Sequence, residues 1–548
     1  MKKDGIQWEI PREASRSRGL RPLVEAPFLR LPRPNLDDNT ADLDRLERAL
    51  AQRGITPLRF DPRTLGEMAG KVREGDFEVC PVVGREGDGW ALIDVVPGAS
   101  PGDVLGFALD CGTSRLAFYL VDLASGKRLA ERSVPNPQIP FGEDILSRIV
   151  KARRRDGLEA LQRCLINACN ETTAALLSEQ GRSPSDVYAF TVAGNTTMSH
   201  FFLGLDPANL CREPYIPVAN HFPFYRAADL GLAIHPRALV YVFPNVGAYF
   251  GGDLIAGIVA CGLHHREDLS MLVDVGTNAE VVLGNRDWLI ACAGAAGPAL
   301  EGGVVERGMM AAPGAIDWIR IDPGSLEPTY RVIGGGKPVG ICGSGLIDLV
   351  AEMFMAGILT IQGKINTQLR SPRIVELPDG PAYIVAFADE TADGMDLAVS
   401  EVDIGILLKS KAAMYTILNV ITRKVGVSLQ DVKHIFIAGT FGNHIDPAMA
   451  IRIGMLPDLP LDTYQGVGNT AGEGAAMLLL DRELLEVVEK LRTRITYIEL
   501  NVNMELMNEF RGATFLPHTD PRLFPSVKIP ERALGRGALR EEWPRGGP

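Results

Sequence analysis

The sequence lacks the cysteine patterns that hold iron–sulfur clusters or structural zinc. Its eight cysteines are scattered, and no two of them form a CxxC pair. Dispersed cysteines of this kind are typical of reduced thiols in a cytoplasmic protein. We therefore expect a cytoplasmic chain that carries no iron–sulfur cluster of its own.

The chain also lacks an uninterrupted hydrophobic run of membrane-spanning length. Its most apolar stretch is LVYVFPNVGAYFGGDLIAGIVACGL (239–263), which Pro244, Asn245 and Asp253 interrupt. The first residues, MKKDGIQWEIPRE, have a positive start but none of the apolar core of a secretion signal. We therefore expect no membrane partner.

Positive charge is in deficit. The 56 lysines and arginines are outnumbered by 68 aspartates and glutamates, which gives a net charge of −12. The densest positive cluster, KARRRDG at 151–157, is typical of a solvated helix face. A protein that binds nucleic acid usually carries a basic patch, so we expect no nucleic-acid partner.

The chain is long enough for several domains, since it has 548 residues of which 46% are hydrophobic and 23% charged. Helical periodicity in NTADLDRLERALAQRG and DPRTLGEMAGKVREG, followed by a strand–turn–strand pattern, predicts a small α+β module. Strands then alternate with helices, the pattern of an α/β fold. The predicted division is a linker over 1–35, the small α+β module over 36–103, α/β halves over 104–265 and 266–521, and a tail over 522–548 whose last part is expected to be disordered.

The α/β region contains an internal repeat. LDCGTSRLAFYLVD (109–122) is echoed by VDVGTNAEVVLG (273–284), and each reads as a strand, Asp-x-Gly-Thr, and a second strand. A second pair of similar segments, VYAFTVAGNTTMSH (187–200) and VKHIFIAGTFGNHI (432–445), follows in the same order. The second half is longer, with its surplus near 320–400. We predict two related α/β domains, one with an insertion, and a ligand cleft between them.

The repeated turn has the chemistry of a phosphate site. Glycine permits a tight turn whose backbone N–H groups and hydroxyls can surround an anion. Aspartate repels phosphate but can hold Mg²⁺, which in turn binds phosphate. One such turn alone is more simply an Asx-capped turn, but two copies within a duplication favour a phosphate clamp. The predicted set is Asp110, Gly112, Thr113 and Ser114 in the first half, and Asp274, Gly276, Thr277 and Asn278 in the second, with Asp110 and Asp274 as metal ligands.

Three further glycine-rich turns are candidates. Gly439, Thr440 and Gly442 in IAGTFGNH can let a nucleoside approach the backbone, or can form an ordinary strand-to-helix turn. Gly343, Ser344 and Gly345 in GICGSG can form an anion site at a helix N-terminus, or can serve helix packing. Asp253 in GGDLIAG can act as a general base that orders water, or simply cap a helix.

The ordered motifs resemble the superfamily of sugar and acetate kinases, chaperone ATPases and actin. The two Asp-x-Gly-Thr hairpins would be its phosphate loops, 437–442 its adenosine loop, and GGDLIAG its catalytic-acid segment. The resemblance implies duplicated actin-like (RNase H-like) ATPase domains that bind ATP and Mg²⁺, with Asp110, Asp253 and Asp274 as catalytic residues.

A closer resemblance is to the ATP-dependent reductive activators of corrinoid proteins. It covers about residues 8–527 and rests on LDCGTS, VAGNTTMSHFFLGLDP, DVGTNAE, AGAAGPALEGG, GICGSGLIDLVAEMFMAGI, AGTFGNHID and FLPHTDPRLFPSV. The module that opens with PNLDDNTADLDRLERAL resembles the family's middle domain. The resemblance implies that ATP drives the reduction of inactive Co(II) to Co(I) in the corrinoid protein of a methyltransferase system, and that the chain forms a homodimer.

The chain departs from the family in one respect, since neither C-x₄-C-x₂-C nor C-x₂-C-x₂-C is present. Family members usually carry an N-terminal ferredoxin domain, and IQWEIPREASR is similar to the junction that follows it. The resemblance therefore implies an external ferredoxin or iron–sulfur donor, or a truncated form. Two alternatives remain open at this point: a small-molecule kinase of the same superfamily, and a nucleotide-sensing scaffold that does not hydrolyse ATP.

Overall fold

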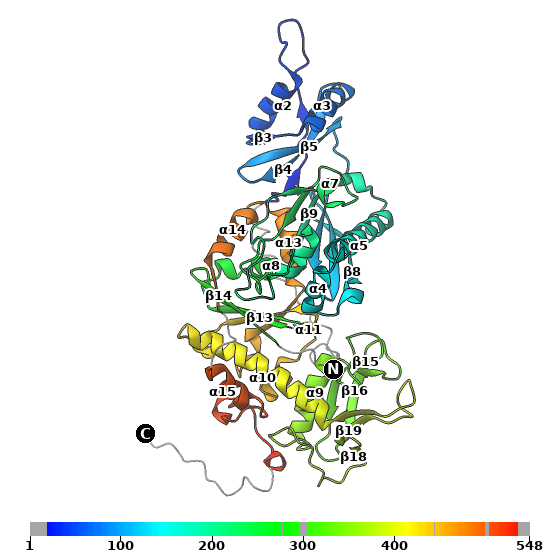
Figure 1. Cartoon of the computed structure of the whole chain (residues 1–548), viewed down its shortest axis with the longest axis vertical. Coiled ribbons are helices and arrows are strands. Elements are labelled where there is room, and N and C mark those ends of the chain that lie inside the picture. The colour runs from blue at the N-terminus through cyan, green and yellow to red at the C-terminus, as the bar shows by residue number, and fades with distance from the viewer. Residues whose placement is uncertain (1–18, 277, 296–304, 443, 499–503, 535–548) are drawn as a thin grey trace. The chain divides into compact units, whose positions relative to one another are not determined.

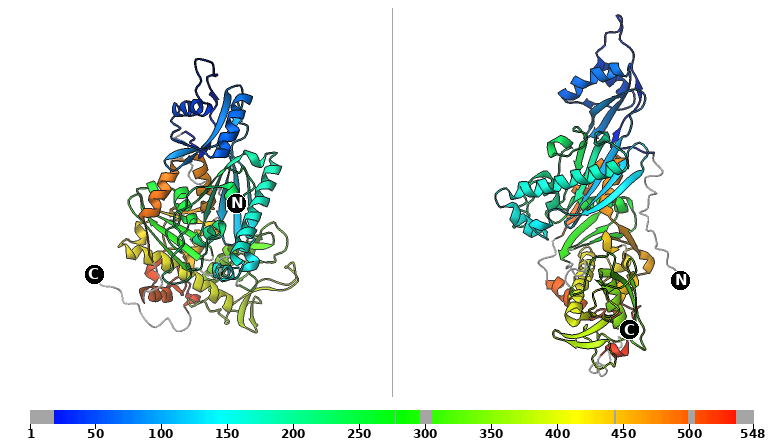
Figure 2. Two further views of the ribbon diagram at one scale, coloured as in Figure 1. Left: turned by 45° about the horizontal axis from the view of Figure 1, so that its top comes forward. Right: turned by 90° about the vertical axis from the view of Figure 1, so that its right-hand side faces the viewer.

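A computed structural model describes residues 19–276, 278–295, 305–442, 444–498 and 504–534. The chain divides into two compact units. Unit 2 comprises residues 10–264 and 470–495, and unit 1 comprises the remaining segments, chiefly 265–469 and 496–548. Figures 1 and 2 show both units, and each is described here by itself.

Unit 2 begins with a small α+β module. Its sheet has the order β1-β4-β5-β3, with β2 also paired to β4. Two amphipathic helices contribute Leu46, Leu50, Met68 and Val72 to its core. The bounds are β1 (Val24–Glu25), β2 (Leu29–Arg30), α2 (Asp42–Ala51), β3 (Leu58–Arg59), α3 (Pro62–Glu74), β4 (Glu78–Glu86) and β5 (Gly89–Pro97). The sheet thus includes residues 24–25 and 29–30, which lie within the predicted linker.

The larger part of unit 2 is built on a six-stranded sheet of order β10-β11-β9-β6-β7-β8. β6, β7 and β8 form an antiparallel meander, while β9 and β11 run parallel to β6. The strands are β6 (Leu105–Cys111), β7 (Arg115–Asp122), β8 (Arg128–Pro135), β9 (Val187–Gly194), β10 (Tyr225–Arg226) and β11 (Leu239–Val242).

Helices cover both faces of this sheet. α4 (Ile145–Ala152), α5 (Gly157–Glu179) and α6 (Thr196–Leu203) share one hydrophobic core with the inward-facing residues of β6 and β9. α8 (Gly252–Cys261) and α13 (Thr470–Leu480) pack together against the other face, with α14 (Leu484–Arg494) beside α8 (Figure 1). A short helix, α7 (Ala227–Leu230), precedes β11.

Unit 1 repeats this topology. Its sheet has the order β22-β21-β12-β13-β14-β23, again an antiparallel meander followed by two parallel strands. The strands are β12 (Ser270–Val275), β13 (Asn278–Gly284), β14 (Leu289–Ala295), β21 (His434–Ala438), β22 (Tyr464–Gly468) and β23 (Ile495–Tyr497). The correspondence of β6 with β12 and of β9 with β21 confirms the α/β duplication predicted from the repeated segments.

The surplus residues of the second half form two small sheets and a core helix. The sheets have the orders β16-β15-β17 and β18-β19-β20. The bounds are β15 (Ala315–Ile321), β16 (Pro328–Val332), β17 (Gly340–Ile341), α9 (Gly343–Met355), β18 (Ile374–Leu377), β19 (Gly380–Ala386) and β20 (Leu397–Ser400). α9 packs on β15.

The remaining helices of unit 1 are α10 (Glu401–Lys424), α11 (Gly439–Gly442), α12 (Pro447–Arg452) and α15 (Met504–Ala513). α10 is long and apolar enough to span a membrane by length and composition, but 78% of its most apolar window is buried inside the protein. Its fully buried Lys411 donates hydrogen bonds to the carbonyl oxygens of Phe515 and Pro517. α10 is therefore a core helix that holds the C-terminal segment.

The two units do not follow the linear order of the chain, because each is built from segments that are distant in the sequence. α13 and α14, within the predicted second half, belong to unit 2, where Thr191 of β9 donates to the carbonyl oxygen of Ala475 at 2.9 Å. In the predicted tail, Phe524 and Ala533 are buried in the core of unit 1. The expected disorder falls on residues 535–548, which lie outside the described part of the chain.

Candidate functional site

The first predicted phosphate loop is the turn between β6 and β7. Asp110 is the penultimate residue of β6 and pairs with Ala117 of β7 and Ala193 of β9. A Cβ at Gly112 would lie 2.6 Å from the carbonyl oxygen of Arg115, so only glycine fits this turn. The loop therefore has its predicted position, at the carboxyl end of a central parallel strand, where ligand sites of α/β sheets form.

Two asparagines that the sequence did not single out hold this loop. Asn195 donates from Nδ2 to Oγ1 of Thr113 at 3.0 Å, while its Oδ1 accepts from the backbone N–H of Met198 and caps α6. Asn136 donates from Nδ2 to the carbonyl oxygen of Gly112 at 2.8 Å. The repeated Ala-Gly segment that contains Asn195 could have marked this residue, whereas no sequence pattern marks Asn136.

Asp253 lies in the first turn of α8, whose N-cap is Gly251. Gly251, and not Asp253, therefore takes the N-cap position. A Cβ at Gly251 would lie only 2.4 Å from Cα of Asn195, so α8 begins in direct contact with the residue that holds Thr113. Unit 2 therefore brings Asp110, the Gly112 turn and Asp253 to one edge of its sheet.

The second predicted phosphate loop lies between β12 and β13. Asp274 is the penultimate residue of β12, and Gly276 follows the strand. Asp274 is partly buried, and the loss of solvation raises the pKa of its carboxyl to about 6. Thr277 lies outside the described residues; Asn278 begins β13.

The register of β12 and β13 adds a carboxylate. Glu280 lies directly opposite Asp274, so the two side chains emerge on the same face of the sheet, with Cβ atoms about 5 Å apart. The sequence analysis did not select Glu280. Its position follows from the register of the hairpin, which sequence spacing alone does not give.

The predicted adenosine loop meets Asp274. Gly439 begins α11 with φ +82°, and a Cβ there would lie 3.0 Å from the carbonyl oxygen of Val275 and 3.3 Å from Oδ1 of Asp274. A Cβ at Gly442 would lie 2.1 Å from the carbonyl oxygen of Ile437. Thr440 is in the same short helix. Unit 1 therefore brings Asp274 and the 439–442 turn together, as the duplication predicts.

Gly343, Ser344 and Gly345 form the first turn of α9 and are buried. A Cβ at Gly345 would lie 2.3 Å from the carbonyl oxygen of Ile316, and Ser344 donates to the carbonyl oxygen of Asp317 at 3.4 Å. These contacts with β15 are the ones expected if the glycines serve the packing of the helix. The anion-site alternative for this turn stays a prediction.

The residues present fit Mg²⁺ bound together with a phosphate ligand. Mg²⁺ is usually held by one or two carboxylates plus substrate oxygens, and Asp110 and Asp274 each offer a carboxylate beside a glycine turn. Within the described part of the chain, no group of three or more His, Cys, Asp or Glu side chains is arranged to hold a metal ion.

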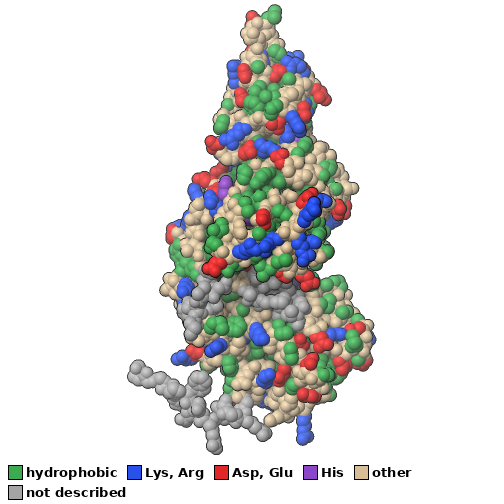
Figure 3. All heavy atoms as spheres, in the orientation of Figure 1, with side chains coloured by type: hydrophobic (Ala, Val, Ile, Leu, Met, Phe, Trp, Pro, Cys, Tyr) green, Lys and Arg blue, Asp and Glu red, His purple; other side chains and the backbone are tan. Residues whose placement is uncertain are grey.

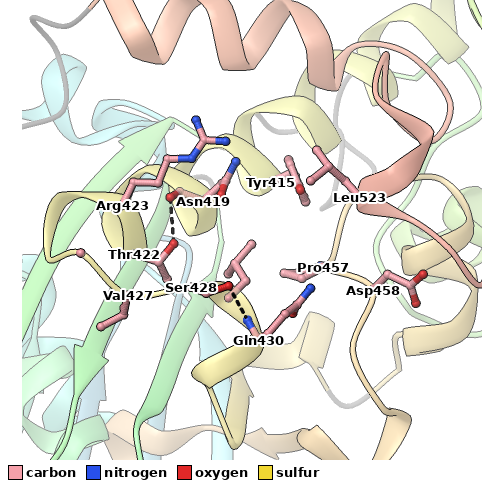
Figure 4. A pocket seen from close by; sticks show the side chains of 12 residues that line it. Tyr415, Asn419, Thr422, Arg423, Val427, Ser428, Gln430, Pro457, Asp458 and Leu523 are labelled. Carbon is pink, nitrogen blue, oxygen red and sulfur yellow. Dashed lines mark hydrogen bonds between the residues drawn. The ribbon is translucent and has the colours of Figure 1, made fainter. Parts of the chain in front are cut away.

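Two other features lie apart from these residues. A cavity of about 450 Å³ in unit 1 is lined mostly by the end of α10 and the residues after it (Figure 4). None of the predicted site residues lines it. On the face shown in Figure 3, acidic and basic side chains are interspersed.

Comparisons with known proteins agree with the duplicated fold. Three family definitions match in succession, described as the RACo linker region over residues 13–101, the RACo middle region over 105–266, and the C-terminal ASKHA domain of RACo over 268–528. The small module that we compared with the family's middle domain is thus the region that this description names the linker.

Two curated relatives and one solved structure are similar over most of their length. The corrinoid activation enzyme RamQ of Eubacterium limosum is 32% identical over 86% of this chain and 79% of its own. The [Co(II) methylated amine-specific corrinoid protein] reductase of Methanosarcina barkeri is 24% identical over 74% of this chain and 75% of its own. A solved reductive activator for corrinoid, iron–sulfur protein is 38% identical, covers 93% of this chain and 81% of that one, and superimposes with a TM-score of 0.85.

Proposed function

The chain belongs to the RACo family of corrinoid activators, and from this premise we propose that it uses ATP to drive the reduction of Co(II) to Co(I) in the corrinoid protein of a methyltransferase system. The observation that carries the proposal is the duplicated hairpin, which places Asp110 and Asp274 at the same register position in two sheets of the same topology.

Each unit carries one of the two predicted phosphate loops. In unit 2, the backbone N–H groups of Gly112, Thr113 and Ser114 would bind phosphate oxygens, and Asp110 would hold Mg²⁺ directly or through water. In unit 1, Asp274 would do the same, and the 439–442 turn would receive the adenosine. Bound Mg²⁺ would neutralise the negative charge of the phosphates and polarise them toward hydrolysis.

Asp253 would orient the water that attacks the terminal phosphate and accept its proton. The position of Asp253 supports this role, because it lies two residues after Gly251, which approaches Asn195, and Asn195 holds Thr113 of the phosphate loop. In the kinase alternative, the same geometry would position a substrate hydroxyl in place of water.

ATP would promote reduction of the cobalt by changing the conformation of the complex between the activator and the corrinoid protein. A ligand shifts an equilibrium only by its difference in affinity between two states. ATP binding and hydrolysis would therefore favour a complex in which the corrinoid protein accepts one electron, so that Co(II) becomes Co(I). That electron would come from a ferredoxin or another iron–sulfur donor, and the activator would work as a cytoplasmic homodimer.

The test is a spectroscopic assay that follows the conversion of Co(II) to Co(I). It combines this chain, Mg-ATP, a strong reductant with a ferredoxin, and a corrinoid protein that is a candidate partner. We expect Co(I) to accumulate only when ATP is present. ATP-independent reduction at the same rate would contradict the proposal, and a phosphorylated small molecule formed at the expense of ATP would replace it with the kinase alternative.

A further inference from the structure

Arg148 is a fully buried arginine on α4. Its guanidinium donates from Nε to the carbonyl oxygen of Gly142 at 2.8 Å and makes long contacts from Nη1 with Oε1 of Gln138 at 3.4 Å and with Sδ of Met198 at 3.7 Å. Its Nη2 is buried and has no hydrogen-bond partner. All of these groups are neutral, so nothing among them balances the positive charge.

A buried arginine is normally paired with a carboxylate. Arg45 follows this rule, since its Nη1 lies 2.5 Å from Oδ2 of Asp38. Within the described residues, Arg148 forms no ion pair within 4.0 Å. Asp144, the N-cap of α4, exerts only a longer-range attraction, and its carboxylate accepts hydrogen bonds from Ser147.

The nearby thiols do not supply the missing negative charge. Cys111 and Cys164 both lie close enough to interact electrostatically with Arg148. Burial raises the pKa of each thiol above its ordinary value, and for Cys111 well above it. Both thiols are therefore neutral at physiological pH, and Arg148 has no ionised partner within 4.0 Å among the described residues.

This charge lies close to the turn that would bind phosphate. Asn136 donates to the carbonyl oxygen of Gly112 and also reaches Sδ of Met198 at 3.9 Å, the same sulfur that Arg148 contacts. Met198 in turn donates its backbone N–H to Asn195, which holds Thr113. Two residues thus lie between Arg148 and the loop on either route, Met198 with Asn136 or Met198 with Asn195. Arg148 is fully buried, so little water screens its field.

We propose that Arg148 is a positioning residue for the nucleotide, whose polyphosphate is the missing counter-charge. The guanidinium would not touch the phosphates, because Met198 and Asn136 lie between it and the Gly112 turn. It makes the potential at the Gly112 turn more positive than the carboxylates there would leave it, and so favours the nucleotides with the most negative charge. This inference rests on the proposed ATP site of unit 2, and it explains why a charge is retained where an apolar side chain would be easier to bury.

The test compares the affinities of ATP, ADP, AMP and adenosine, with Mg²⁺ present, in the intact chain and in Arg148→Met. We expect the loss of charge to weaken ATP binding roughly tenfold or more, ADP and AMP binding progressively less, and adenosine binding hardly at all. Arg148→Lys, which keeps the charge, should retain the order ATP, ADP, AMP. A purely structural role would instead change the affinities of all four ligands by the same factor, or change none of them.

The matched control is Arg132→Met, which removes a positive charge from the same unit at an exposed pair with Glu179. It should leave all four affinities unchanged. If Arg148→Met does not fold, Arg148→Gln removes the charge but keeps a donor for Gly142, and it should give the same graded loss.

Equal losses for all four ligands, or no loss, would overturn the inference. Failure of the unaltered chain to bind any nucleotide would overturn both the inference and the proposed function. Nucleotide binding with the graded loss, but without ATP-driven cobalt reduction, would overturn the proposed function alone.

Discussion

Asp110 of unit 2 and Asp274 of unit 1 occupy the same position in their sheets. Each is the penultimate residue of the first strand, and each lies opposite an alanine of the neighbouring parallel strand, Ala193 in unit 2 and Ala438 in unit 1. The surroundings differ on the other side, because Asp110 faces Ala117 whereas Asp274 faces Glu280. The duplicated carboxylates are therefore equivalent in position but not in electrostatic environment.

Removing either carboxylate should abolish turnover without unfolding the chain. We expect Asp110→Asn and Asp274→Asn each to lower Mg-ATP hydrolysis at least roughly hundredfold, because each loses a charged ligand for Mg²⁺. ATPase rates at saturating Mg²⁺ and thermal unfolding measure the two effects. Asp122→Asn is the control, since Asp122 lies at the far end of the same hairpin and only supports a turn through Ala124 and Ser125. Normal turnover in either site variant would contradict the phosphate-clamp assignment.

Asp274 should also make stability depend on pH. Its pKa of about 6 in the folded chain lies above the usual 3.8, so the folded state binds the proton more tightly than the unfolded state. The resulting stabilisation is fully present below pH 3.8 and is lost as the pH rises through about 6. In the absence of Mg²⁺, Asp274→Asn should therefore be more stable than the unaltered chain at pH 8, by at most about 2 kcal/mol given the partial exposure of Asp274.

Thermal unfolding of both proteins from pH 4.5 to pH 8 measures this difference. The gap between the two melting temperatures should widen as the pH rises, and added Mg-ATP should reverse its sign at pH 8, because only the ionised carboxylate binds the metal. A gap that does not change with pH would show that burial does not raise the pKa of Asp274.

Asp253 should contribute to the rate of hydrolysis more than to nucleotide affinity. We expect Asp253→Asn to lower kcat roughly hundredfold and to change the Kd of Mg-ATP by less than about threefold, because an amide can still accept the hydrogen bond from the backbone N–H of Leu254 but cannot accept a proton from water. Glu159→Gln is the control, since it alters an acid in the first turn of α5 that pairs with Arg163. Equal losses in kcat and affinity would point to a metal ligand instead.

The sequence predicted the paired hairpins because their signal is local. Asp-x-Gly-Thr, the flanking β propensity and the repeated Ala-Gly strands all lie within short segments, and they sufficed to locate the first strands of both sheets and the Asp110 and Asp274 turns. The small α+β module was found for the same reason, since α2 and α3 are amphipathic helices and β4 and β5 are mostly apolar strands joined by a short turn.

The parts that sequence reasoning missed depend on long-range contacts. β1 and β2 have two residues each, too few to show a period. The return of α13 to unit 2 depends on close packing, in which a Cβ at Gly474 would lie 2.1 Å from the carbonyl oxygen of Ala256, and no local pattern indicates that partner. No sequence motif marks Arg148, because only the fold shows that its face of α4 is dry and that no carboxylate among the described residues pairs with it.

Gly439 offers a test of the contact between the adenosine loop and Asp274. Its φ of +82° disfavours any other residue, and a Cβ there would also press on Oδ1 of Asp274 at 3.3 Å and on the carbonyl oxygen of Val275 at 3.0 Å. Gly394 in the same unit has φ +72° with nothing within 4 Å of a Cβ, so it isolates the conformational part of the effect. Both Gly439→Ala and Gly394→Ala should lower the free energy of unfolding by about 1 kcal/mol.

Only Gly439→Ala should in addition weaken Mg-ATP binding, because only there does the new methyl group displace the carboxylate that would hold the metal. Calorimetric titration with Mg-ATP and urea denaturation of the two variants separate the two effects. We expect the Kd to rise at least roughly tenfold for Gly439→Ala, which corresponds to about 1.4 kcal/mol, and to stay unchanged for Gly394→Ala. If the two variants bound Mg-ATP equally well, the 439–442 turn would not belong to the nucleotide site, and the contact with Asp274 would be a matter of packing alone.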